Sequence, residues 1–180
     1  MNIWLTTDTH FGHKRLIERG RPEDFEARIW RGLKLVSASD ILIHLGDVSL
    51  GNDREHHERL VNEVTAKRKW LIKGNHDDRS NAWYMDRGWD MVCDQLTYTF
   101  EGKRIVFSHC PTAWDGAYDW NFHGHFHDSD HRRLEPEFVA IAHPRQKLLA
   151  LEFTDYKPVL LQHAIKEASA AERTTPEETP

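Results

Sequence analysis

Short apolar runs alternate with amphipathic stretches over the first half of the chain. The apolar runs cover residues 1–6, 40–45 and 69–73. Each has the length and the β-branched or aromatic content of a buried strand. Between them, residues 23–36 and a stretch that Asn52 or Asp53 could cap carry apolar side chains at helical spacing. Three rounds of strand, loop and helix predict a parallel α/β sheet.

The second half of the chain has a different pattern. Residues 96–100 and 104–108 alternate apolar and polar side chains around a turn at 101–103, which predicts a hairpin. Before this hairpin, Ser80 is expected to cap a short helix that ends near Gly88. Further strand-like runs cover residues 120–123, 138–142, 148–153 and 159–161. We therefore expect a mostly β second half that packs as a second sheet on the first.

The end of the chain contrasts with both halves. From residue 166 onward the sequence is mainly Ala, Glu, Thr and Pro with almost no large apolar side chain, which predicts a disordered tail over residues 166–180. The 180 residues are enough for one domain with a core and too few for two. The sequence has no repeat and no interior linker, and we expect a single domain over residues 1–165.

Charge and composition narrow the class of protein. The formal net charge is −5, which is not the footprint of a protein that holds long nucleic acids by general electrostatics. No apolar run approaches the roughly 20 residues that a membrane span needs, and the N-terminus has no signal-peptide pattern. We expect a cytoplasmic protein without a membrane partner, in which Cys93 and Cys110 are free thiols. Composition does not indicate an oligomeric state.

Five loops at the ends of strand-like runs carry side chains that bind metals. They are Asp8-Thr9-His10, Gly46-Asp47, Gly74-Asn75-His76-Asp77, His109 and Gly124-His125-Phe126-His127. Five of the 13 histidines fall in these loops, which makes the histidine distribution far from even. In an α/β protein such loops gather at one edge of the sheet, where reactive groups are kept. Carboxylate, imidazole and carboxamide groups suit Mn²⁺, Fe, Zn²⁺, Ni²⁺ or Mg²⁺.

The number of candidate ligands points to more than one ion. The candidates are Asp8, His10, Asp47, Asn75, His109, His125 and His127. Seven are too many for one open catalytic site and enough for two ions. A bridging carboxylate would let two ions lie about 3.5–4 Å apart and share a water, whose lowered pKa gives hydroxide near neutral pH. Phosphoryl transfer uses such a pair well, because both ions also polarise the phosphate oxygens.

The motif order D-x-H, G-D, G-N-H-D, H, G-H-x-H resembles that of the calcineurin-like metallophosphoesterases. The match runs from Asp8 to His127, with strands continuing to about Leu161. The extended first motif over residues 8–13 and the short length are similar to small bacterial and phage members without a cap domain. The resemblance implies an α/β fold of two packed mixed β-sheets flanked by helices, a four-layer sandwich, which agrees with the pattern above.

The resemblance also implies roles for the candidate residues. One ion would be held by Asp8, His10, Asp47 and His127, and the other by Asp47, Asn75, His109 and His125, with Asp47 as the bridge. We expect two divalent ions, Mn²⁺ first, with Fe, Zn²⁺, Ni²⁺ and Mg²⁺ as alternatives. His76 would contact the substrate phosphate and protonate the leaving oxygen. The catalytic set is thus His76, Asp47 and Asn75.

Residues near the ligand loops are expected to act less directly. His13 and Arg79 are candidates for substrate contact. Asp77 is a third candidate, which would orient His76 or hydrogen-bond within its own loop. His56 and His57 are expected to be inert on an exposed helix face. Glycines 12, 46, 74 and 124 stand beside ligands, where the absence of Cβ permits tight turns.

The leading function is a phosphoesterase that prefers phosphodiesters, since no segment is long enough to form a cap over the site. Protein phosphatases of the superfamily carry G-D-x-x-D-R-G and G-N-H-E, whereas this chain has G-D-V-S-L-G from Gly46 and G-N-H-D from Gly74. Family analogy suggests a nucleotide or a short or cyclic nucleic-acid diester. The alternatives are a phosphomonoesterase and a non-catalytic metal-binding scaffold of the same fold.

Overall fold

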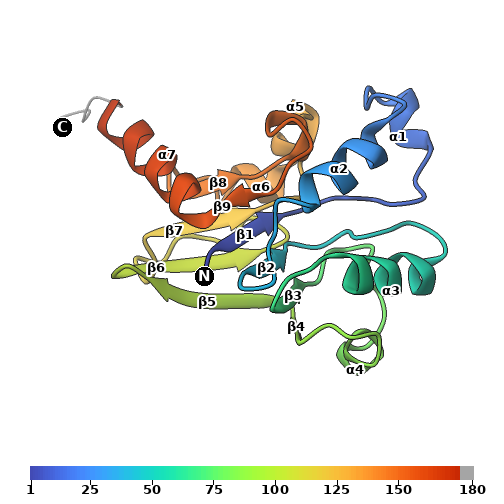
Figure 1. Ribbon diagram of the computed structural model, residues 1–180. Coiled ribbons are helices and arrows are strands. Elements are labelled where there is room, and N and C mark those ends of the chain that lie inside the picture. Colours follow the sequence, from blue (N-terminus) through green and yellow to red (C-terminus); the bar gives the residue numbers. More distant parts are fainter. Residues whose placement is uncertain (175–180) are drawn as a thin grey trace, which may run out of the picture.

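Two β-sheets pack against each other in the computed structural model, which describes residues 1–174 (Figure 1). The first sheet has the strand order β4-β3-β2-β1-β9 and the second has the order β5-β6-β7-β8. Helices flank the sheets, with α2 and α3 on one side and α7 near the C-terminal end. The predicted architecture of two packed mixed sheets with flanking helices is confirmed.

The first sheet contains the predicted parallel half of the chain. Its strands are β1 (Ile3–Thr6), β2 (Ile41–His44), β3 (Arg68–Ile72), β4 (Met91–Cys93) and β9 (Val159–Leu160). Strands β1 to β4 are parallel neighbours, and β9 pairs antiparallel with β1. The connections contain α1 (Arg15–Glu18), α2 (Phe25–Leu33), α3 (Asp53–Glu63) and α4 (Asn81–Met85). Ser80 caps α4 as predicted, because its hydroxyl accepts a hydrogen bond from Trp83 N at 3.2 Å.

The second sheet is mixed. Strands β5 (Gln95–Phe100) and β6 (Lys103–Ser108) form the predicted antiparallel hairpin. Strands β7 (Trp120–His123) and β8 (Gln146–Leu148) follow as parallel neighbours. The thiols of Cys93 and Cys110 are free, as expected.

Two strands predicted in the second half are wrong. Residues 138–142 do not form a strand, because α6 (Pro136–Val139) occupies that stretch after α5 (Asp130–Arg133). Pro136 stands in the first helical turn, where its fixed φ favours a helix. The strand predicted at 148–153 is also absent, because β8 already ends at Leu148 and Leu151–Phe153 forms a single 3₁₀ turn, η1. Strand β4 and helix α1 were not predicted.

The predicted tail differs as well. Helix α7 (Leu161–Thr174) extends through residues 166–174 instead of disorder beginning at 166. Leu161, Ala164 and Ala168 form its buried face at helical spacing, and alanine has the highest intrinsic helix propensity. Small side chains therefore suffice for a helix that packs on the core. Residues 175–180 of the predicted tail lie outside the described residues.

The first sheet is buried on both faces. Ile3, Leu5 and Ile43 point toward the second sheet and pack with Phe107 and Phe122. The alternate positions, among them Leu42 and Leu71, pack on the side of α2 and α3. Strands covered on both faces read as continuous apolar runs, which is why they were predictable.

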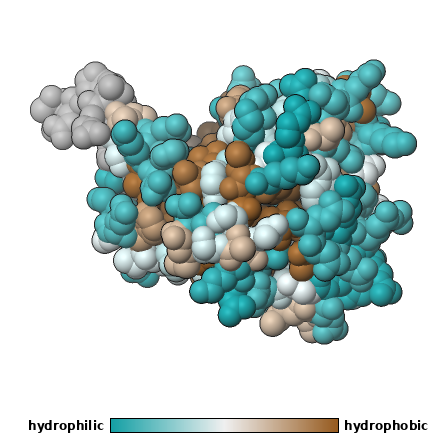
Figure 2. Space-filling view, in the orientation of Figure 1, coloured by the Kyte–Doolittle hydropathy of each residue, from teal (hydrophilic) through white to brown (hydrophobic). Residues whose placement is uncertain are grey.

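The surface over the helices is polar. In Figure 2 hydrophilic residues cover the region of α1 and α3, while hydrophobic residues gather in a hollow between α7 and α2. Among the described helices, none combines the length and hydropathy that a membrane span requires.

Candidate active site

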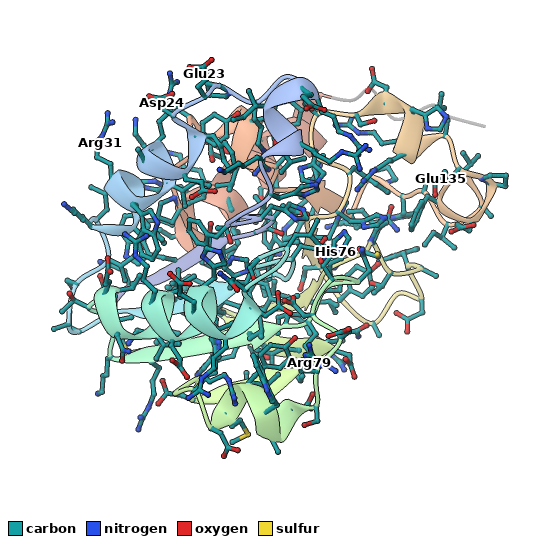
Figure 3. The ribbon with its side chains drawn as sticks, turned by 90° about the vertical axis from the view of Figure 1, so that its right-hand side faces the viewer. Glu23, Asp24, Arg31, His76, Arg79 and Glu135 are labelled. Atoms are coloured by element: carbon teal, nitrogen blue, oxygen red, sulfur yellow. The ribbon has the colours of Figure 1, made fainter. Side chains whose placement is uncertain are left out.

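The five predicted ligand loops meet on one face of the molecule. Three of them follow strands of the first sheet (β1, β2 and β3), and two follow strands of the second sheet (β6 and β7). Figure 3 looks onto this face, with His76 near its middle, Arg79 below it and Glu135 to one side. The site therefore draws its side chains from both sheets.

Asp8, His10 and His127 form a buried group that we call the inner half-site. The Oδ1 atom of Asp8 lies 3.7 Å from His10 Nε2 and 3.6 Å from His127 Nε2. The two imidazole rings stack with their centroids 5.1 Å apart. Asp8 Oδ1, His10 Nε2 and His127 Nε2 are thus close enough together to share one ion.

Asn75, His109 and His125 form a second group, the outer half-site. Asn75 Oδ1 lies 3.1 Å from His109 Nε2 and 3.0 Å from His125 Nδ1, and the two nitrogens are 3.2 Å apart. His109 is buried, His125 is half-buried and Asn75 is exposed. This group is therefore more open to solvent than the inner half-site.

Asp47 lies between the two half-sites. Its Oδ2 atom is 3.5 Å from His10 Nε2 and 3.4 Å from His109 Nε2. One carboxylate oxygen thus faces both groups. All seven predicted ligands are brought together, in the two groups that the family resemblance implies, with Asp47 between them.

The donor atoms fit two divalent ions. Atoms that share an ion through bonds of about 2.0–2.2 Å lie about 3.0–3.6 Å apart. The separations above, from 3.0 to 3.7 Å, fall close to this range. Asp8 Oδ1 and His10 Nε2 are also buried and make no hydrogen bond, which is costly for a polar atom unless a ligand satisfies it.

Charges in the site favour cation binding. Burial raises the pKa of Asp8, but nearby imidazoles, His10 first, outweigh it and hold that pKa well below its ordinary value. Burial lowers the pKa of His125 to about 4, so its ring is neutral at pH 7. Burial also lowers the pKa of His109, yet the Asp47 carboxylate outweighs it and raises the pKa to about 9. An ion would therefore displace a proton from His109 at neutral pH.

Each carboxylate is oriented by its second oxygen. Asp8 Oδ2 accepts hydrogen bonds from Thr7 Oγ1 at 2.6 Å and from the His125 backbone N at 3.0 Å. Asp47 Oδ1 accepts one from the His76 backbone N at 2.9 Å. Since these oxygens are engaged, the other oxygen of each carboxylate points toward the imidazoles.

Five of the seven predicted ligands lie on strained backbone. The non-glycine residues with positive φ include Asp8, His10, Asp47, His125 and His127, at 47° to 73°. Left-handed backbone costs roughly 1 kcal/mol or more at such residues and persists where the surroundings enforce it. Backbone hydrogen bonds between the first two loops, Asp8 N to Gly46 O at 2.9 Å and His10 N to Asp47 O at 3.0 Å, help to enforce it.

Close approach explains two of the glycines. A Cβ at Gly74 would overlap Asp47 Oδ1, and a Cβ at Gly124 would overlap Asp8 Oδ2. Both glycines therefore let a backbone segment pass directly behind a carboxylate ligand, as the sequence analysis expected.

His44 is a supporting residue that the sequence analysis missed. It is fully buried, its Nδ1 accepts a hydrogen bond from Gly46 N at 3.1 Å, and its Nε2 lies 3.0 Å from Thr9 Oγ1. The Thr9 hydroxyl donates in turn to Val48 O at 2.8 Å. Burial lowers the pKa of His44 to about 3, so the neutral ring joins the first two ligand loops. A histidine inside an otherwise apolar strand was the available signal.

Asp77 lies beneath the site instead of facing substrate. Its Oδ2 accepts hydrogen bonds from Asp47 N at 2.8 Å and Gly74 N at 2.9 Å, and its side chain is buried. Burial raises its pKa to about 6. The bond from Gly74 is the loop hydrogen bond that was the alternative role for Asp77, and the bond from Asp47 ties a second ligand loop to it.

His57 is also corrected, because it is buried and not on an exposed face. Trp89 Nε1 donates to His57 Nδ1 at 3.1 Å, and His57 Nε2 lies 3.7 Å from Asp77 Oδ1. The His57 side chain lies on the buried face of α3, toward Trp89 and Asp77. The neighbouring His56 is half-buried. His57 thus belongs to the layer that supports Asp77.

Glu152 and Arg21 support the inner half-site and were missed. Glu152 Oε1 lies 3.3 Å from His127 Nδ1, so the ring can donate there and present Nε2 toward Asp8. Arg21 is buried and donates from Nε to Glu152 Oε1 at 2.7 Å. Its Nη2 lies 3.1 Å from the same His127 Nδ1, which can accept from Arg21 only when it carries no proton and therefore does not donate to Glu152. Burial raises the pKa of Glu152, but His127 and Arg21 outweigh it and lower the pKa to about 2.

The remaining candidates lie at different places. His76 Nε2 is 3.9 Å from Asp47 Oδ2, with 34% of its side chain exposed. The His13 ring lies 5.4 Å from the His10 ring, and burial lowers the pKa of His13 to about 4. Arg79 is exposed and pairs with Asp78 at 3.4 Å, so it sits beside α4 and not among the ligands.

Comparisons with known proteins identify the family of the chain. The calcineurin-like phosphoesterase family profile matches residues 1–167. The chain is similar to the Gene 66 protein of Mycobacterium phage D29, with 36% identity over 161 residues, covering 70% of this chain and 78% of that protein. It is also 38% identical over 85 residues to the Gene 66 protein of Mycobacterium phage L5, covering 42% of this chain and 40% of that protein.

A solved structure shares the fold. A protein of unknown function from Aquifex aeolicus, AQ665, superposes with a TM-score of 0.70 and 26% identity, covering 92% of this chain and 98% of that one. The family profile spans the whole of both sheets and all five ligand loops. The chain belongs to the calcineurin-like phosphoesterase family.

Proposed function

We propose that the protein hydrolyses phosphodiesters with two divalent ions, Mn²⁺ first among them. The observation that carries this proposal is the position of Asp47 Oδ2 between the two half-sites, 3.5 Å from His10 and 3.4 Å from His109. Two ions sharing this oxygen would polarise the phosphate oxygens and lower the pKa of a water between them. The protein's part is to hold seven donor atoms in place and to keep the carboxylates ionised.

His76 is the residue proposed to handle the leaving group. Its backbone N is fixed on Asp47 Oδ1 at 2.9 Å, while its partly exposed ring reaches over Asp47 Oδ2. A phosphate held by the half-sites would place its leaving oxygen within reach of Nε2, from which a proton can pass. His13, whose ring also lies 5.4 Å from the His10 ring, is proposed to contact the same phosphate.

Access to the site supports a diester. Asn75 is exposed and His125 half-buried, so the outer half-site opens to solvent and leaves room for a second ester group. A nucleotide or a short or cyclic nucleic-acid diester is the proposed substrate class, by family analogy. The cytoplasmic location stays a prediction.

The test replaces His76 by Ala in protein loaded with Mn²⁺. Loss of a positioned acid should lower kcat on a thymidine dinucleotide, whose leaving alkoxide needs a proton, by about 10²–10⁴-fold, while elemental analysis still finds two ions per chain. His163→Ala, an exposed histidine on α7, is the matched control and should keep the rate. An unchanged rate in His76→Ala would remove His76 from the mechanism.

Relative rates decide among the alternatives. Faster hydrolysis of p-nitrophenyl phosphate than of bis-p-nitrophenyl phosphate would make the protein a phosphomonoesterase. Two bound ions without hydrolysis of either compound would leave the non-catalytic metal-binding scaffold.

A further inference from the structure

A cavity of about 350 Å³ opens beside the inner half-site. Its wall includes Arg19, Arg21, His127, Asp128, Arg132 and Glu152. These residues come from the segment after α1, from the last ligand loop with the stretch that follows it, and from η1. The cavity is thus built where three segments meet beside the site.

The cavity carries an excess of positive charge. Arg21 is already neutralised, since its Nε donates to Glu152 Oε1 at 2.7 Å. Two further arginines, Arg19 and Arg132, line the cavity together with one further acidic residue, Asp128. Arg132 uses Nη1 to donate to the His125 carbonyl at 2.8 Å, which leaves its other N–H groups available. Within the described residues the Arg19 guanidinium is exposed and makes no ion pair.

The cavity is adjacent to the proposed reaction centre. His127 belongs to both: its Nε2 lies 3.6 Å from Asp8 Oδ1, and its ring lines the cavity. Arg132 is anchored on the backbone of another predicted ligand, His125. His127 therefore belongs to both the inner half-site and the wall of the cavity.

Another cavity provides a contrast. The depression beside α3 contains Arg54 and Arg79, but its wall also carries Asp53, Glu55 and Glu58, and none of the predicted metal ligands. Its charges therefore do not select an anion, and it does not adjoin the half-sites. An excess of guanidinium groups next to a predicted ligand distinguishes the cavity at Arg19.

We propose that this cavity binds a second phosphate group of the substrate, next to the diester that is cleaved. The inference rests on the proposed function and narrows it to nucleotidic diesters that carry a neighbouring phosphate. Guanidinium groups suit this ligand, because they donate two parallel hydrogen bonds to phosphate oxygens. Arg19 and Arg132 determine the preference for substrates with this second phosphate, while Arg21 holds the wall of the cavity in place.

Two chromogenic substrates that differ by one group test the proposal. Thymidine 5′-(p-nitrophenyl phosphate) has only the scissile diester, and its 3′-phosphorylated form adds a neighbouring phosphate. With the full chain and Mn²⁺ at low salt, kcat/KM should be about 10-fold or more higher for the 3′-phosphorylated compound, as expected for a charged hydrogen bond. The preference should shrink as salt screens the charges.

Variants assign the preference to the cavity. Arg19→Gln and Arg132→Gln should each lower the ratio of the two kcat/KM values, and the double variant should bring it close to one. Arg31→Gln removes a charge on α2, far from His76 in Figure 3, and should keep the wild-type ratio. Arg19→Gln alone suffices if the Arg132 variant fails to fold, because Arg19 is exposed.

Each result has a distinct meaning. Equal kcat/KM for the two compounds in the wild-type protein overturns the second-phosphate site while the proposed diesterase stands. A preference that survives Arg19→Gln and the double variant overturns the assignment to this cavity. Failure of the metal-loaded protein to cleave either compound counts against the proposed function itself.

Discussion

The inner and outer half-sites position their predicted ligands by different means. Asp8 and His127 in the inner half-site are held by residues behind them: Thr7 orients the carboxylate and Glu152 faces the imidazole. In the outer half-site the Asn75 and His125 side chains hydrogen-bond within the group itself. The inner half-site is thus held in place by its surroundings, whereas an ion in the outer half-site would have to replace the hydrogen bonds that its donors make with one another. We expect a tightly bound inner ion and a weaker outer one.

The strongest test of this comparison removes what the half-sites share. Asp47→Asn should weaken both ions together and lower the rate by at least about 10³-fold, because it takes a charged oxygen from each. Elemental analysis and kinetics measure the two effects. Asp8→Asn serves as the comparison and should chiefly affect the inner ion. Loss of a single ion from Asp47→Asn would contradict the bridge.

The next test removes a ligand from the outer half-site only. Asn75→Ala should lower the affinity for the second ion by about 100-fold or more, since even supporting residues contribute 10–100-fold. Calorimetric titration with Mn²⁺ should then show one tight and one very weak site. Asn62→Ala, exposed on α3, should titrate like the wild-type protein. If Asn75→Ala weakens the tighter ion instead, the order of the half-sites is reversed.

A smaller effect is expected behind the inner half-site. Glu152→Gln should reduce the affinity for the inner ion by about 10–100-fold and leave the outer ion unaffected, because His127 loses its charged partner. The same titration measures it, with the exposed Glu23→Gln as the control. An unchanged inner affinity would show that Arg21 and packing suffice to position His127.

The smallest effect concerns a carboxylate outside both half-sites. Asp40, at the opposite end of β2, is buried and accepts hydrogen bonds from Asn2 N, Trp4 Nε1 and Ser37. Burial raises its pKa, but these donors outweigh it and hold the pKa well below the ordinary value. Its stabilisation should be complete above the unfolded-state pKa and decline as pH falls below about 4.

Asp40→Asn measures that contribution. The free energy of unfolding at pH 7 should fall by about 1–3 kcal/mol, and the difference from the wild-type protein should narrow toward pH 3. Urea unfolding with chelator present follows it without any contribution from bound ions. A difference that stays constant from pH 7 to pH 3 would exclude Asp40 as its source.

The first three strands and the candidate ligand positions after them could be predicted from the sequence for a physical reason. Strands β1 to β3 are buried on both faces, so their apolar runs are unambiguous, and the ligands follow directly at their ends. The residues that support those ligands come from far along the chain. Glu152 lies 131 positions from Arg21, and no local pattern links the two.

Local patterns also failed where an element's orientation decides the outcome. His57 reads as exposed beside Glu55 and Glu58, yet the rotation of α3 brings it onto Trp89. Residues 138–142 are apolar enough for a strand, but the parallel neighbour of β7 is β8, and the segment between them is helical. Register and helix rotation are set by tertiary packing, which a single sequence does not display.

The ligand loops come from both sheets, so a pair of cations would fasten the two layers at their common edge. Such a link couples metal supply to folding. Above the dissociation constant, each tenfold rise in the free ion concentration adds about 1.4 kcal/mol to the free energy of unfolding for every ion that binds only the folded state. Shortage of the ion would then destabilise the contact between the two sheets as well as stop turnover.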